Sequence, residues 1–302
     1  MTVAAPGSRR QHDAAAGPRH EARSRAMTSV TGQFVSYETG QPYETLLVEV
    51  VDRVATVTLN RPESGNALNA QLHAELADFW QGARDDDGVW VVILTGAGQR
   101  HFCTGADMRE AASGSEGRLG SRRVMGLPWP YRFFKPIICA LNGTAAGGGL
   151  IFVWESHITI AADHVSFLEP HLSVGQVPAS EIYGLANGGL PWNIGHRMAL
   201  LGTTGERVSA QRMYDLGVVS ELVPAERLLE RARELADNVM QMSPLATRAY
   251  LEGAWQMRED GAGVSAGSNH GHALGHALRE TEDYLEGPRS FVERRRPVWK
   301  AR

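Results

Sequence analysis

Two glycine-rich loops stand out because their backbone N–H groups could meet at one substrate atom. The first covers residues 101–108 (His-Phe-Cys-Thr-Gly-Ala-Asp-Met), and the second covers residues 142–149 (Asn-Gly-Thr-Ala-Ala-Gly-Gly-Gly). Each follows an apolar, β-branched run, at 91–94 and at 136–141, which indicates a strand leading into a helix. Glycine lets the backbone approach a ligand closely, and a helix N-terminus has unused N–H donors. The pair therefore predicts two donors aimed at one developing oxyanion.

The order and spacing of these loops resemble the crotonase superfamily, the enoyl-CoA hydratase/isomerase enzymes of acyl-CoA chemistry. The resemblance runs from about Leu46 to Lys300, and its further matching segments are 58–63 with 66–69, 205–211 with 216–219, and 291–297. It implies an α/β fold, a crotonase-like spiral of ββα units followed by a C-terminal helical region. It also implies an enzyme that acts on an acyl-CoA thioester.

In that family, two backbone N–H groups hold the thioester carbonyl oxygen, and the resemblance assigns them to Ala106 and Gly148. One preorganised donor of this kind is worth ~3–4 kcal/mol of barrier. Of the neighbouring residues, Asp107 is expected to cap a helix rather than to act as a catalyst. The loop residues expected to contact the substrate or its CoA are Gly105, Asp107, Met108, Gly147 and Gly149.

The sequence departs from the family at both positions that carry the hydratase glutamates. The first glutamate normally lies two residues after the third glycine of the run, where this chain has Ile151, which cannot move a proton. The second normally ends a Phe-x-x-Pro-Glu segment, and the corresponding residue here is His171. Ile151 is therefore expected to line the acyl site, and the usual two-glutamate mechanism is not expected.

Four side chains are candidates to replace the missing glutamates. His171 has an ordinary pKa of ~6.5, which suits a general acid or base, although a lone histidine can also be structural. Glu181 lies in a loop from which other branches draw an acid, and its alternative is a first-turn helix glutamate. Glu155, one turn past Ile151, either replaces a carboxylate or forms a structural ion pair. Glu169 either orients the imidazole from an extended segment or is solvated.

These candidates leave several functions open. The leading expectation is an enolate-stabilising enzyme with one main acid/base group, His171 or Glu181, for which double-bond isomerisation is the best fit. Hydration or lyase chemistry by an altered pair, His171 with Glu181 or Glu155, comes second. A crotonase-fold C–C hydrolase comes third. From another class, a non-catalytic acyl-CoA-binding protein with the same fold would explain the loss of both glutamates.

Composition limits the partners. No cofactor is expected beyond the CoA of the substrate, and Arg295, in a basic C-terminal run, is the candidate for a CoA phosphate. The two cysteines give neither a disulfide framework nor metal-ligand spacing, so we expect no metal and a reducing, cytoplasmic setting. A net charge of −4 gives no reason to expect nucleic acid, and no apolar run reaches the ~20 residues that span a bilayer.

Three regions are expected along the chain. Residues 1–40 are rich in small and basic residues and predict a disordered tail, residues 41–223 the spiral core, and residues 224–302 a helical trimerisation region. The tail would also fit an over-long start, with Met27 as the natural initiator.

Local patterns predict several elements of this plan. Residues 46–51 and 54–59 predict a hairpin, and residues 113–130 predict a mobile loop. An apolar stripe at 228–239 and the family habit favour a homotrimer or a dimer of trimers with the C-terminal helices at the contact. Asn69 is expected to cap a helix with one apolar face, formed by Leu72, Leu76, Phe79 and Ala83.

Overall fold

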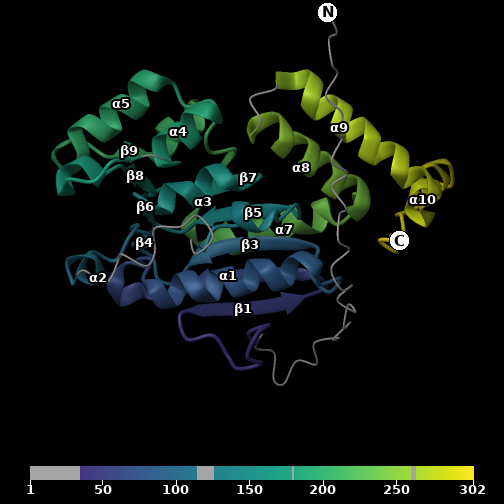
Figure 1. The fold of residues 1–302 in the computed structure, drawn as a ribbon, viewed down its shortest axis with the longest axis horizontal. Helices are drawn as coiled ribbons and strands as arrows, with labels where there is room; N and C mark the ends of the chain where they lie inside the picture. Colours follow the sequence, from purple (N-terminus) through teal and green to yellow (C-terminus); the bar gives the residue numbers. More distant parts are fainter. Residues whose placement is uncertain (1–34, 114–125, 179, 260–262) are drawn as a thin grey trace, which may run out of the picture.

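Two β-sheets and the helices that follow their strands form the body of the molecule (Figure 1). The computed structural model describes residues 35–113, 126–178, 180–259 and 263–302. The larger sheet has the order β1-β2-β3-β5-β7-β10, and its strands are β1 (Leu46–Val51), β2 (Val54–Leu59), β3 (Val91–Gly96), β5 (Ile137–Leu141), β7 (Ile158–Ala162) and β10 (Glu221–Val223). The smaller sheet has the order β4-β6-β8-β9, and its strands are β4 (His101–Cys103), β6 (Thr144–Ala146), β8 (Ser166–Leu168) and β9 (Val208–Ser209).

A strand–strand–helix unit repeats through the core. Each unit has one strand in the larger sheet, the next in the smaller sheet and then a helix: β3, β4 and α2 (Met108–Ala112); β5, β6 and α3 (Gly149–Glu155); β7, β8 and α4 (Ser180–Asn187). This confirms the crotonase-like spiral of ββα units. Because β4, β6 and β8 are parallel neighbours, the turns that follow them gather at one edge of the smaller sheet.

The predicted hairpin forms with β1 antiparallel to β2. Its two turn residues, Asp52 and Arg53, have φ of 50° and 66°, the left-handed values of a tight hairpin turn. β2 then pairs in parallel with β3, so the hairpin forms the edge of the larger sheet.

The larger sheet is covered on both faces, which explains why every residue of β3 is buried. Val92 and Leu94 belong to the core that includes the helix α1 (Ala70–Asp85), whereas Val91 and Ile93 belong to a second core with α7 (Leu228–Val239). The predicted N-cap of α1 is confirmed, because the Asn69 side chain accepts a hydrogen bond from the Leu72 N–H at 2.9 Å. The predicted apolar face of α1 is fully buried: Leu72, Leu76, Phe79 and Ala83.

Part of the apolar stripe at 228–239 belongs to the core of this chain. Leu228, Ala232 and Ala236 of α7 are buried against the larger sheet of the same chain, so they are not available to a neighbouring subunit. These three residues are therefore core, since a stripe shows that a helix face is buried but not what buries it. Oligomerisation remains a prediction.

The start of the folded part also differs from the expected boundary at residue 40. The N–H groups of Tyr37 and Glu38 donate to the Asp78 carboxylate on α1, each at 2.9 Å. The Tyr37 ring packs on Gly82, where an added Cβ would lie 2.1 Å from it. Residues 35–40 therefore belong with the core, while residues 1–34 of the expected tail lie outside the described residues.

The remaining helices complete the two ends of the molecule. In Figure 1, α4 and α5 lie at one end and α8, α9 and α10 at the other, which confirms the C-terminal helical region. No helix among the described residues is long and apolar enough to span a membrane. Of the predicted loop at 113–130, residues 114–125 lie outside the described residues. The helices not bounded above are α5 (Trp192–Leu201), α6 (Ala210–Asp215), α8 (Pro244–Glu259), α9 (Gly263–Ala277) and α10 (Glu282–Val292).

Candidate active site

The first glycine-rich loop is held by backbone hydrogen bonds to the segment before α1. The Leu68 N–H donates to the Gly105 carbonyl at 2.8 Å, and the Asp107 N–H donates to the Leu68 carbonyl at 3.0 Å. The intervening Ala106 is partly exposed. In the described chain, no backbone hydrogen bond has the Ala106 N–H as its donor. That N–H is thus held in a fixed loop and left unused.

The second loop touches the first. A Cβ added at Gly105, which has φ of +86°, would lie 2.9 Å from the Gly148 nitrogen and 3.0 Å from the Ala146 oxygen. Gly148 is partly exposed and precedes α3, and no backbone hydrogen bond of the described residues has its N–H as donor. The fold thus brings together the two loops that lie some forty residues apart in the sequence.

Asp107 has the capping role expected from the sequence. Its side chain accepts from the N–H groups of Arg109 and Glu110 at the start of α2, and it forms an ion pair with Arg61 at 2.9 Å. Burial opposes ionisation of Asp107, but the hydrogen bonds from Arg61 and the helix start outweigh it and hold the pKa of Asp107 below its ordinary range. Met108, the first residue of α2, is largely exposed.

His171 lies beside the second loop. A Cβ added at Gly147 would lie 3.3 Å from Cε1 of the His171 ring. The ring Nδ1 is 2.5 Å from Oε1 of Glu169, and the His171 backbone N–H donates to the same oxygen at 2.9 Å. Glu169 is completely buried, so the alternative of a solvated Glu169 is wrong. The segment is not extended, because the chain turns at Pro170 into a 3₁₀ helix, His171–Val174, but Glu169 contacts the imidazole as its other alternative predicted.

Glu181 completes a row of three titratable side chains. It lies in the first turn of α4, with 7% of its surface exposed, and its Oε1 is 3.8 Å from Nε2 of His171. Burial is the main reason why the pKa of Glu181 lies above its ordinary value. The hydrogen bond to Glu169 is the main reason why the pKa of His171 is raised, and it outweighs the opposing effect of burial. The imidazole therefore lies between two carboxylates.

The same three residues have donor atoms close enough together to raise the question of a metal site. The short contact between Nδ1 of His171 and Oε1 of Glu169 already uses one atom of each. Nε2 of His171 and the Glu181 carboxylate then face each other at 3.8 Å, and the other Glu169 oxygen, Oε2, is completely buried, whereas catalytic zinc sites use three protein ligands and keep an open position. The geometry fits proton transfer between the imidazole and a carboxylate better than metal coordination.

Ile151 and Glu155 lie at opposite ends of the short helix α3. Ile151 is 2% exposed in the first turn, next to the second glycine-rich loop, where it presents an apolar side chain. Glu155 ends the helix, and its Oε2 accepts a hydrogen bond from the Trp129 N–H at 3.1 Å. This contact supports a structural role for Glu155.

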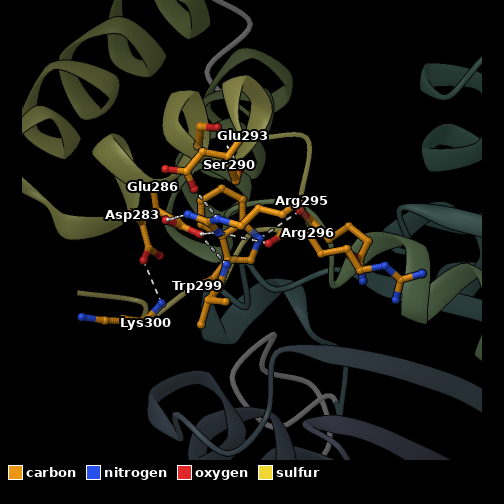
Figure 2. Close-up of polar contacts among 11 residues, drawn as sticks. Asp283, Glu286, Ser290, Glu293, Arg295, Arg296, Trp299 and Lys300 are labelled. Atoms are coloured by element: carbon orange, nitrogen blue, oxygen red, sulfur yellow. Dashed lines mark hydrogen bonds and ion pairs between the residues drawn. The ribbon is translucent and has the colours of Figure 1, made fainter.

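Arg295 lies apart from both loops. Its guanidinium contacts Glu286 at 2.5 and 2.9 Å and Glu293 at 2.6 Å, within the C-terminal network that Figure 2 shows. The helix α10, from which this segment follows, is at the opposite end of the molecule from α2 in Figure 1. Of the residues predicted for the site, Arg295 is thus not brought to the glycine-rich loops, and its contact with CoA stays a prediction.

Two asparagines and Leu68 support the site, although the sequence analysis gave them no role there. Asn66 Nδ2 donates to the carbonyls of Ala97 and His101, both at 3.0 Å, which fixes the turn before the first loop. Asn142 Oδ1 accepts from the Gly96 N–H at 3.0 Å. Both asparagines lie in segments that carry the family resemblance, and this resemblance is the sequence feature from which their structural role could have been predicted.

Comparison with known proteins gives a consistent answer. The family model described as enoyl-CoA hydratase/isomerase matches residues 49–302. The chain is 35% identical over 261 residues to an (E)-benzylidenesuccinyl-CoA hydratase of Thauera aromatica, which covers 84% of this chain and 98% of that protein. It is 34% identical over 253 residues to a carnitinyl-CoA dehydratase of Proteus mirabilis, covering 82% of this chain and 95% of that protein.

Solved structures show the same fold. An enoyl-CoA hydratase/isomerase from Mycobacterium paratuberculosis is 38% identical, with a TM-score of 0.78, and the match covers 86% of this chain and 100% of that one. An enoyl-CoA hydratase from Mycobacterium tuberculosis H37Rv is 30% identical, with a TM-score of 0.77, and covers 85% of this chain and 99% of that one. With its ββα spiral and adjoining glycine-rich loops, the chain belongs to the enoyl-CoA hydratase/isomerase family of the crotonase superfamily.

Proposed function

We propose that this enzyme catalyses the reversible addition of water across the α,β double bond of an enoyl-CoA, with His171 and Glu181 as its proton-transfer pair. The observation that carries the proposal is the 3.8 Å separation of His171 Nε2 and Glu181 Oε1, beside the two glycine-rich loops. One oxygen atom lying to the side of both can be about 2.8 Å from each, which is hydrogen-bonding distance. A water molecule in that position contacts one group that accepts a proton, Glu181, and one group that donates a proton, His171.

The thioester carbonyl is assigned to the N–H groups of Ala106 and Gly148. Both residues are partly exposed, and their loops are in contact through Gly105. Negative charge develops on this oxygen when the β-carbon is attacked, and preorganised donors stabilise that charge more than they stabilise the neutral carbonyl. Ile151, buried in the first turn of α3, keeps the adjoining wall apolar.

The working form of the His171–Glu181 pair carries one proton. Glu169 accepts from Nδ1 and raises the pKa of His171, which favours the imidazolium, and the proposal therefore places the proton on the imidazole. Glu181 is then the carboxylate, and burial makes it a stronger base than an exposed glutamate. This assigns the general base to Glu181 and the general acid to His171.

In the hydration direction, Glu181 removes a proton from water as the water oxygen forms a bond to the β-carbon. The π electrons of the double bond move toward the thioester oxygen and form an enolate held by Ala106 and Gly148. The enolate then takes the Nε2 proton of His171 at its α-carbon. Passage of the proton from Glu181 to His171 restores the starting form, so each turnover consumes one water and no net proton.

Isomerisation needs only one base and remains the alternative reaction. Two proton-carrying groups in one place favour hydration, and the relatives named above are a hydratase and a dehydratase. Their names specify an aromatic dicarboxylic acyl group and a carnitinyl group, which suggests acyl groups other than simple straight chains. We therefore propose an enoyl-CoA with a substituted acyl group as substrate.

The test is to assay hydration of a panel of enoyl-CoA thioesters with the wild type and with His171→Ala and Glu181→Gln. Loss of either proton carrier is expected to lower kcat by roughly 10²–10⁴-fold with the fold intact. His196→Ala, an exposed histidine on α5, is the matched control and should keep full activity. Activity retained in both site variants, or lost in Glu155→Gln, would refute the assignment.

Exchange of solvent deuterium into the α-carbon of a bound saturated acyl-CoA separates an enzyme from a binding protein. A non-catalytic acyl-CoA-binding protein gives no exchange, whereas the proposed enzyme exchanges through His171. Products that retain the double bond at a shifted position would favour isomerisation.

Two expectations about the whole protein complete the proposal. We propose a homotrimer or a dimer of trimers, for which light scattering at micromolar concentration is the test. We also propose a reducing, cytoplasmic setting, supported by two buried free thiols, Cys103 and Cys139.

A further inference from the structure

The carboxylate of Glu169 has an unusual environment. Its surface is completely buried, and its Oε2 has no hydrogen-bond partner among the described residues. Its Oε1 receives two N–H groups, and both come from His171, from the backbone at 2.9 Å and from the ring at 2.5 Å. Burial of a carboxylate without a compensating partner is strongly unfavourable, so the pairing with His171 is what makes the burial of Glu169 tolerable.

We propose that Glu169 is a positioning residue, which holds the His171 ring with Nδ1–H inward and Nε2 toward Glu181 and the glycine-rich loops. This inference rests on the proposed function and adds to it the group that sets the tautomer and orientation of its acid. The ring would otherwise rotate about two side-chain torsions. Two hydrogen bonds to one buried oxygen remove that freedom before substrate arrives.

A backbone hydrogen bond links the segment before Glu169 to the second glycine-rich loop. Leu168, the residue before Glu169, accepts a hydrogen bond from the Gly147 N–H at 3.2 Å. A Cβ added at Gly147 would meet the His171 ring at 3.3 Å, and Gly147 directly precedes Gly148. The turn that carries the carboxylate is therefore bonded to the loop that carries the donor, and His171 is held at a fixed position relative to Gly148.

Two carboxylates face the imidazole from different elements. Glu169 lies at Nδ1, from the turn after β8, and Glu181 lies near Nε2, from α4. The neighbouring first turn of α3 contributes glycine backbone and Ile151, which carry no charge. Removing the charge of Glu169 should destabilise the imidazolium and lower the pKa of His171.

The decisive variant is Glu169→Gln, which keeps the size of the side chain and removes its charge. Because His171 is the acid, activity falls as pH rises through its pKa, and this alkaline limb should move to lower pH in the variant. We expect kcat to fall roughly 10²-fold with little change in KM. The His171 imidazole resonance, assigned by its loss in His171→Gln, should titrate at a lower pH than in the wild type.

Glu75→Gln is the matched control. Glu75 is also a buried glutamate, but it lies on α1 and accepts from the Glu44 N–H and the Thr45 N–H. Its substitution should lower the melting temperature without moving the alkaline limb. Glu169→Asp covers the case in which Glu169→Gln does not fold, because it keeps the charge but withdraws it by one methylene. Its kcat should fall while the folded enzyme still binds substrate.

The outcomes separate this inference from the proposed function. An unchanged His171 titration and an unmoved alkaline limb in Glu169→Gln would overturn the positioning role and leave a purely structural glutamate. An unchanged kcat in Glu169→Asp would overturn it as well. A shifted His171 titration together with full activity of His171→Ala would uphold the contact and refute the proposed function.

Discussion

Replacing Gly105 with alanine tests whether contact between the two loops sets the position of the Gly148 donor. The added Cβ would lie 2.9 Å from the Gly148 nitrogen and 3.0 Å from the Ala146 oxygen, while an ordinary contact begins at 3.4 Å. The obstructing atoms are backbone, so no side chain can rotate away. The loops must separate by several tenths of an ångström, or the first loop must change its path.

The cost has two parts that can be estimated separately. A non-glycine residue in the left-handed region costs ~1–2 kcal/mol, and Gly105 has φ of +86°. Displacement of an oxyanion-hole donor adds a kinetic cost, because removal of one donor lowers kcat by ~10²–10³-fold. We therefore expect Gly105→Ala to lose ~10²-fold in kcat and at least 1 kcal/mol of unfolding free energy.

Gly217→Ala measures the backbone cost of a left-handed alanine by itself. Gly217 has φ of +77°, and an added Cβ there meets nothing within 4 Å. Thermal unfolding and steady-state kinetics of both variants should show a similar backbone penalty, with the loss of kcat confined to Gly105→Ala. Equal activity of the two variants would show that the Gly105 contact does not position the donor.

Three further predictions concern pH and stability. The pH dependence of kcat/KM should be bell-shaped, with an acid limb where Glu181 is protonated and an alkaline limb where His171 loses its proton. Both limbs should lie above the ordinary pKa values of these two groups, and Glu181→Gln should remove the acid limb. Asn69→Ala should remove the cap of α1 and lower the unfolding free energy by ~1 kcal/mol, measured by urea denaturation, whereas an unchanged midpoint would contradict the capping role. Burial lowers the pKa of His73 from 6.5 to about 4, so the unfolded chain binds more protons between these values. The contribution of neutral His73 to the unfolding free energy should be fully present above pH 6.5 and should fall by up to ~3 kcal/mol as pH drops to 4. His73→Asn should flatten this pH dependence.

The sequence predicted those parts of the fold that depend on neighbouring residues. The Asn69 cap and the Asp52-Arg53 turn follow from local backbone chemistry, and both are confirmed. The partner of the stripe at 228–239 could not be predicted, because periodicity identifies a buried face and not the surface that covers it.

The cluster around His171 shows a similar limit. Glu169 was considered as an orienting group from an extended segment, but the turn at Pro170 brings its carboxylate back to the ring by another path. The approach of Glu181 depends on how closely α4 packs on α3. Gly184 permits this packing, since a Cβ there would lie 2.2 Å from the Trp154 ring. Such a distance results from tertiary packing, which no short motif encodes.

The repeated strand–strand–helix unit divides the chemistry among separate pieces of chain. The first unit supplies Ala106, the second supplies Gly148, and the third supplies His171 and Glu181. In the proposed mechanism, carbonyl activation thus belongs to two of these units, and proton transfer belongs to the third, which ends with α4. Exchanging residues 169–181 for another proton-handling segment would change the reaction while the thioester-activating modules stay intact. On this proposal, the reaction type is set by one exchangeable segment of the fold, and in this chain that segment contains His171.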